Sequence, residues 1–191
     1  MTKPLSPSSP HAKSLHDYLD NHWALNGGDL GLPKADYDKT PVLSVPCIPS
    51  DTGKPLQCWF NVDEDVRAGK GSAVFGWALW HAPWADHYFA QPHAVLRASG
   101  ELVCITPPEP GMEELEHLTF FADPRIPFDY KQLRVPMMLC YKGGDSIGDF
   151  GPFRWLDFSH KPLHVDGAWS TERPDNFNMG SMLEANLADD C

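Results

Sequence analysis

The sequence lacks the features that are usual in a nucleic-acid-binding protein or a membrane protein. It has 15 Lys and Arg against 26 Asp and Glu, a formal net charge of -11, and no cluster of basic residues. Nucleic-acid binders normally carry such a cluster, because neutralising phosphates supplies much of their affinity. No stretch approaches the roughly 18 consecutive apolar residues that a spanning helix needs. We therefore expect neither a nucleic-acid nor a membrane partner.

Features of a secreted protein are also lacking. Residues 1–15 contain no apolar core followed by a small-residue cleavage site, so we expect no secretory leader. The five cysteines, at 47, 58, 104, 140 and 191, are odd in number and form no CxxC pair. Such spacing does not favour a disulfide framework, and it fits reduced thiols in a cytoplasmic protein better.

What the chain does contain is enough apolar material for one core. Its 191 residues are 42% hydrophobic, which suits one domain, since domains commonly hold roughly 100–200 residues. The 19 prolines predict much irregular structure and few long helices. We expect a disordered tail at 1–12, one globular domain at 13–170 and a second tail at 171–191.

Local patterns predict an α+β fold. Helices are expected at 13–25 and 56–69, the second ended by Gly69 and Gly71. An edge strand is expected at 41–48, a buried central strand at 72–81, and two strands at 88–98 and 101–106 joined by a tight turn at Ser99-Gly100. One or two helical turns are expected within 111–118, with short strands beyond residue 119. The expected architecture is a small antiparallel sheet with the 56–69 helix packed on it and long proline-rich loops.

The chemical signal in this pattern is a cysteine paired with a histidine. Cys58 stands at the predicted start of the second helix, where unpaired backbone N–H groups and the helix dipole favour a thiolate. A thiolate nucleophile needs a base, and His93 on a predicted strand is the natural candidate.

These residues carry a family resemblance. Cys58-Trp59 and His93-Ala94-Val95 resemble the cysteine and histidine motifs of papain-like proteases, and a helix bearing the cysteine against a sheet bearing the histidine is the papain-like and transglutaminase-like arrangement. Residues 56–125 also resemble a set of uncharacterised bacterial and phage proteins. The matching segments are Cys58-Trp59-Phe60-Asn61-Val62, Gly76-Trp77-Ala78, His93-Ala94-Val95-Leu96 and Leu102-Val103-Cys104-Ile105-Thr106-Pro107.

The chain departs from that pattern at one important position. The family's aspartate, which would orient the histidine, is Cys104 here. If Ser99-Gly100 is a two-residue turn, His93 faces Thr106 and lies diagonal to Cys104 on one sheet face. A neutral thiol is a weak hydrogen-bond partner for this role. Gln57 is a candidate oxyanion donor and Gln91 a candidate orienting group.

The same residues allow interpretations other than an enzyme. Buried cysteine often acts only as a small hydrophobe. The missing aspartate favours a non-catalytic interaction domain on a degenerate hydrolase scaffold. Cys58, His93 and Cys104 could instead share a zinc ion with a fourth ligand, and His81, His87 and His93 recur every six residues.

Several further features have a structural interpretation. The tryptophans at 77, 80 and 84 are expected in the core, the acids at 63–65 on a solvated helix face, and Gly143-Gly144-Asp145 in a turn. Asp123 is a functional acid only if its loop covers the site.

The sequence thus predicts a cysteine-dependent hydrolase or acyl-transfer enzyme without a cofactor. Cys58 is the expected nucleophile and His93 the base, with Cys104 and Gln57 completing the site. The expected substrate is a peptide, a protein or a small amide or thioester.

Overall fold

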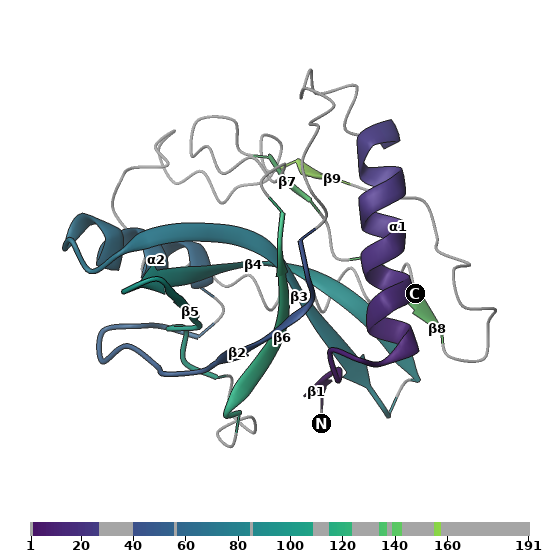
Figure 1. The fold of residues 1–191 in the computed structure, drawn as a ribbon, viewed down its shortest axis with the longest axis horizontal. Coiled ribbons are helices and arrows are strands. Elements are labelled where there is room, and N and C mark those ends of the chain that lie inside the picture. The colour runs from purple at the N-terminus through teal and green to yellow at the C-terminus, as the bar shows by residue number, and fades with distance from the viewer. Residues whose placement is uncertain are drawn as a thin grey trace.

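In the described part of the chain the fold is a mostly antiparallel sheet with two helices, which agrees with the expected α+β class (Figure 1). The computed structural model describes residues 2–26, 40–55, 57–84, 86–108, 115–123, 134–136, 139–142 and 155–157. Five strands form the main path of the sheet, in the order β2-β6-β3-β4-β5. These strands are β2 (Leu43–Pro46), β6 (His117–Ala122), β3 (Ser72–Ala82), β4 (His87–Ala98) and β5 (Glu101–Val103).

Four short strands complete the described structure. β1 (Lys3–Pro4) pairs with β3, and β8 (Leu139–Lys142) pairs with β4. β7 (Arg134–Pro136) and β9 (Trp155–Asp157) form a separate two-stranded sheet. Short strands beyond residue 119 are therefore confirmed.

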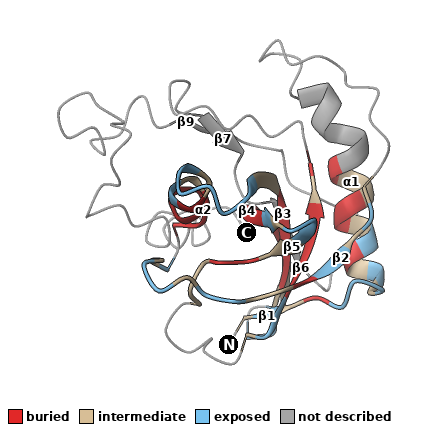
Figure 2. Cartoon of the chain, turned by 60° about the vertical axis from the view of Figure 1, so that its left-hand side comes forward, coloured by how far each residue is buried: buried red, intermediate tan, exposed pale blue. Residues whose placement is uncertain are grey.

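The β3–β4 hairpin is the centre of the core. β3 is buried on both faces, as its uncharged apolar run predicted. One face packs in a cluster with Trp77 and Leu79, and the other in a cluster with Ala78 and Trp80. Figure 2 shows the buried residues gathered on these central strands and on the sheet-facing sides of the helices.

The turn between β4 and β5 sets the register of the site. Ser99 and Gly100 both have positive φ angles, 51° and 90°, which are typical of a two-residue type I′ hairpin. Ala98 pairs with Glu101 and Leu96 with Val103. Continued along the strand, this register sets His93 opposite Thr106, on the face that also carries Cys104.

The two edges of the sheet meet beyond β2 and β5. Cys47 and Cys104 form a parallel bridge, in which the Cys104 N–H donates to the Pro46 carbonyl and the Ile48 N–H donates to the Cys104 carbonyl, both at 2.9 Å. The Ser50 N–H donates to the Ile105 carbonyl at 2.9 Å. We call these contacts, between residues 46–50 and 104–105, the closure. It curls the sheet back on itself in a nearly closed, barrel-like form.

The first helix is longer than its sequence pattern indicated. α1 (Pro10–Asn26) packs Ala12, Leu15 and Leu19, all fully buried, against the sheet. Residues 1–12 were expected to form a tail, but β1 pairs with β3 and Leu5 is buried in the same cluster. The proline- and serine-rich sequence of this segment does not by itself reveal the pairing of β1 with β3, because β3 lies over 70 residues away in the chain.

The second helix, α2 (Cys58–Arg67), lies on the other side of the sheet from α1 in Figure 1. Its C-terminus has the hydrogen bonds of a Schellman motif: the Gly69 N–H donates to the Val66 carbonyl and the Lys70 N–H to the Asp65 carbonyl. Gly69 has the positive φ, 75°, that this motif requires. The glycine stop predicted from the sequence is confirmed.

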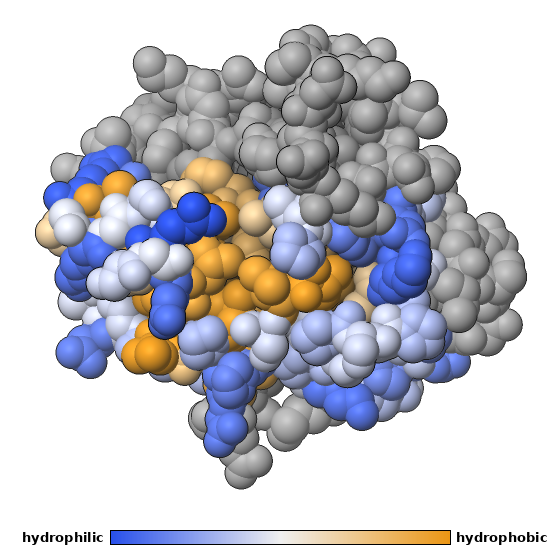
Figure 3. Space-filling view, viewed as in Figure 1, coloured by the Kyte–Doolittle hydropathy of each residue, from blue (hydrophilic) through white to orange (hydrophobic). Residues whose placement is uncertain are grey.

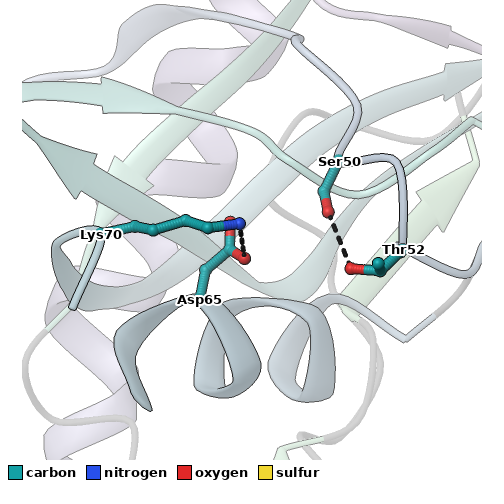
Figure 4. Close-up of polar contacts among 4 residues, drawn as sticks. All are labelled: Ser50, Thr52, Asp65 and Lys70. Atoms are coloured by element: carbon teal, nitrogen blue, oxygen red, sulfur yellow. Dashed lines mark hydrogen bonds and ion pairs between the residues drawn. The ribbon is translucent and has the colours of Figure 1, made fainter. Parts of the chain in front are cut away.

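One acid of this helix is not where the sequence placed it. Asp65 is 5% exposed, and its carboxylate accepts a hydrogen bond from the Lys70 ammonium at 2.7 Å (Figure 4). Ser50 and Thr52, hydrogen-bonded to each other, lie in the loop beside this pair. The expectation of a solvated acidic face is thus wrong for Asp65, because the Lys70 partner allows the carboxylate to be buried.

Two further expectations need correction. Trp84 was expected in the core but is 73% exposed, because it lies in the turn between β3 and β4. His117 and Leu118 were expected in helical turns but belong to β6. Residues 111–114, the Gly143-Gly144-Asp145 segment and the 171–191 tail lie outside the described residues.

The described surface mixes apolar and polar areas. Figure 3 shows apolar residues gathered in the middle of one face, with hydrophilic residues around them. No helix in the described part of the chain is long and apolar enough to cross a membrane.

Gly76 offers a test of the packing between β3 and β6. A Cβ atom at this position would lie 2.0 Å from the Phe121 carbonyl oxygen and 2.5 Å from the Phe120 ring. We expect Gly76→Ala to lower the free energy of unfolding by about 2 kcal/mol or more, since overpacking forces the backbone apart. Chemical denaturation measures this. Ser72→Ala, at the exposed start of the same strand, is the control, and equal stability of the two variants would contradict the packing.

Candidate functional site

Cys58 is the first residue of α2, as the sequence predicted. It follows Gln57, whose backbone carbonyl accepts a hydrogen bond from the Asn61 N–H at 2.9 Å and so closes the first helical turn. The first N–H groups of a helix have no partner within the helix. The Cys58 side chain is therefore set beside the positive end of α2, and it is 7% exposed.

Asn61 fixes this helix end to its surroundings. Its side-chain amide donates to the Lys54 carbonyl at 2.9 Å and accepts from the Lys54 N–H at 3.0 Å. The same amide donates to the Thr106 hydroxyl at 3.2 Å. One buried side chain therefore joins the loop before α2 to the strand segment that carries Cys104.

His93 lies in the middle of β4, opposite Gly76 of β3. Its imidazole is 8% exposed, and its Nε2 lies 3.3 Å from the Cys104 sulfur. The diagonal neighbour relation that the turn register predicted is therefore present. The Cys58 sulfur is also a hydrogen-bond partner of the His93 ring. The imidazole thus has two sulfur partners, one at the start of α2 and one just after β5.

Cys47 is a member of the site that the sequence did not indicate. It follows β2 and is the bridge partner of Cys104 across the closure. Its thiol hydrogen-bonds the Cys104 sulfur. Cys104 therefore has polar partners on two sides, Cys47 and His93, and its sulfur also accepts a hydrogen bond from the Thr106 backbone N–H.

The protonation of this cluster follows from these contacts. Burial by itself lowers the pKa of His93, but the sulfurs of Cys58 and Cys104 raise it, and the resulting pKa is about 10. The hydrogen bond from Cys47 lowers the pKa of Cys104 against the effect of burial, and His93 lowers it further. The pKa of Cys47 is raised by its hydrogen bond to Cys104 and by burial. These contacts therefore favour a Cys47 thiol beside a Cys104 thiolate and a His93 imidazolium.

A thiolate at position 104 can take the role that a carboxylate has in a catalytic triad. A neutral thiol is a weak acceptor, but a thiolate is an anion. An anion that accepts a hydrogen bond from one imidazole nitrogen fixes both the orientation and the protonation of the ring, as a carboxylate does. Cys104 can therefore hold His93 in place.

The two glutamines differ in their relation to the cluster. Gln57 is 6% exposed and adjoins Cys58 directly, at the start of α2. Gln91 is partly buried in β4, two residues before His93 and on the same strand face. Their proposed roles, as oxyanion donor and orienting group, stay predictions.

Two other sequence candidates lie away from this cluster. Asp123 is fully buried and accepts a hydrogen bond from the Trp77 indole N–H at 3.0 Å. His81 belongs to β3, whereas His87 and His93 belong to β4, so the regular spacing does not place all three on one strand. His87 and His93 are about 20 Å apart along their strand, six residues at about 3.3 Å each.

Metal binding gains no support from the described part of the chain. There, no group of three or more His, Cys, Asp and Glu side chains is arranged to hold a metal ion.

The imidazole titration tests the cluster directly. We expect the NMR midpoint of His93 near pH 10, because the neighbouring thiolate stabilises the imidazolium. The folded pKa lies above the unfolded value of 6.5, so the stability that His93 protonation contributes is fully present below pH 6.5 and is lost as pH rises through about 10. Cys104→Ala should lower the midpoint and Cys104→Asp should keep it high. A wild-type midpoint near 6.5 would contradict the thiolate–imidazolium arrangement.

Comparison with known proteins does not assign the site. No family model matches the chain, and neither does a curated protein or a solved structure. The case for a function therefore depends on the geometry around His93.

Proposed function

We propose that the protein is a cysteine-dependent hydrolase or acyl-transfer enzyme with a papain-like arrangement of its catalytic groups. The observation that carries the proposal is that the His93 ring has two sulfur partners, Cys58 at the start of α2 and Cys104, whose sulfur lies 3.3 Å from Nε2. A nucleophile, a base and an orienting group are the three members that a catalytic triad needs.

In this proposal Cys58 is the nucleophile. Its thiolate attacks the carbonyl carbon of an amide or thioester, and the carbonyl oxygen becomes an oxyanion. The Cys58 backbone N–H at the helix start and the Gln57 side-chain amide are the candidate donors to that oxyanion. His93 donates its proton to the leaving amine or thiol, which departs and leaves an acyl group on Cys58.

The second half of the reaction uses the same groups in reverse. His93 accepts a proton from water, or from an acceptor amine or alcohol, which attacks the acyl carbon. The bond to sulfur breaks and the Cys58 thiolate is restored. Throughout, Cys104 accepts the hydrogen bond from Nε2 and keeps the imidazole directed toward Cys58.

One observation favours the competing, non-catalytic reading. Cys58 and His93 are 7% and 8% exposed, so little of either side chain meets solvent. A binding domain that keeps the scaffold needs no accessible thiol. Thiol reactivity therefore separates the two functions.

The decisive measurement is iodoacetamide labelling between pH 5 and 9, resolved by cysteine with mass spectrometry. If exposure alone governed reactivity, the partly exposed Cys47 would label before the buried Cys58. We expect Cys58 to label fastest near neutral pH and His93→Ala to slow it about tenfold or more, since a thiolate needs its imidazolium partner. His117→Ala, which removes an exposed histidine on β6, is the matched control.

Variants at position 104 sharpen this test. Cys104→Asp supplies the carboxylate of the pattern that the chain resembles, and we expect it to retain the labelling rate of Cys58. Cys104→Ala should slow labelling as much as His93→Ala does. Labelling of Cys58 that is slower than that of Cys47 and unaffected by all three variants would favour the binding domain.

A further inference from the structure

The hydrogen bond between the Cys47 and Cys104 sulfurs has no role in the proposed acyl-transfer reaction. Cys47, Cys58 and Cys104 are free cysteines, and the sulfurs of Cys47 and Cys104 are hydrogen-bonded to each other. A hydrolase needs one anion beside His93, and it needs no second thiol behind that anion. Cys47 is therefore unexplained by the proposed function.

The backbone places these two cysteines at the spacing of a disulfide. They are direct partners in a parallel bridge, in which Cys104 donates a backbone hydrogen bond to Pro46 and accepts one from Ile48. Neighbouring strands lie about 4.7–4.9 Å apart. A disulfide accepts Cα separations of about 4.4–6.8 Å, a range that includes this strand spacing.

The two thiols are also unequal in the way that oxidation chemistry requires. The thiolate is the reactive form of cysteine, and Cys104 is the member of the pair whose pKa is lowered. Cys47 remains a thiol, is partly exposed, and lies in contact with the Cys104 sulfur. One cysteine is thus suited to react first and the other to resolve the product.

We propose that Cys104 and Cys47 are a modification site at which a hydroperoxide forms an intramolecular disulfide across the closure. The Cys104 sulfur attacks one oxygen of hydrogen peroxide, the O–O bond breaks, and Cys104 becomes a sulfenic acid while water leaves. The Cys47 sulfur then attacks the Cys104 sulfur, the S–O bond breaks, and a second water leaves. Two thiols lose two electrons and two protons, and one peroxide is reduced to two waters.

Disulfide formation changes the environment of His93. The anion that accepts its Nε2 hydrogen bond is consumed, and the remaining sulfur partner is Cys58. The imidazolium loses much of its stabilisation, so the NMR midpoint of His93 should fall from near 10 and return on reduction. Disulfide formation itself does not rest on the proposed hydrolase activity, whereas any effect on Cys58 chemistry does.

Peptide mapping of the folded wild-type protein tests the proposal. After treatment with hydrogen peroxide and blocking of free thiols, we expect one non-reduced peptide pair joining Cys47 to Cys104, lighter than the reduced pair by two hydrogens. Cys58→Ser should leave this product unchanged. In denaturant, mixed pairings that include Cys140 and Cys191 should replace it.

Variants identify the reacting sulfur. In Cys47→Ser, dimedone should trap a sulfenic acid at Cys104, because the resolving thiol is absent. Three outcomes would each overturn the proposal. The first is a disulfide between Cys58 and Cys104, and the second is no disulfide in the folded wild-type protein. The third is a dimedone adduct that forms at Cys47 in Cys104→Ser but not at Cys104 in Cys47→Ser. None of these outcomes depends on a substrate, so failure here is distinguishable from failure of the hydrolase proposal.

Discussion

The closure between residues 46–50 and 104–105 is the constraint on which the site depends. Three backbone hydrogen bonds join the end of β2 to the chain after β5, and they fix Cys104 at the point where both edges of the sheet meet. A free sheet edge would leave residue 104 beside solvent. Because the edge is closed, Cys104 is 3% exposed, and its sulfur lies between Cys47 and His93.

Two further constraints link the position of Cys104 to that of α2. The type I′ turn at Ser99-Gly100 sets the register in which Cys104 and His93 share a sheet face. Asn61 then ties α2 to Thr106, two residues beyond Cys104. Nucleophile candidate, imidazole and thiolate therefore belong to one hydrogen-bonded unit, although they come from a helix and two different strands.

Burial determines which charges this unit can hold. It would make either an isolated imidazolium or an isolated thiolate costly, so the charges at His93 and Cys104 exist only as a pair. A cysteine at position 104 thus supplies an anion that can be oxidised. A carboxylate would orient His93 equally well and would not respond to peroxide. Acyl transfer and redox chemistry, if both operate, therefore compete for one sulfur.

The sequence by itself determined the local elements. The apolar run of β3, the glycine stop after α2 and the Ser99-Gly100 turn are short-range signals, and they predicted the central strand, the start of the cysteine-bearing helix and the His93–Cys104 register. Only the tertiary structure brought Cys47 to Cys104, paired β1 with β3 and buried Asp65 beside Lys70. The first two contacts join segments more than 50 residues apart that carry no matching pattern. The charge state of the cluster was likewise decided by proximity and burial, which no local sequence pattern encodes.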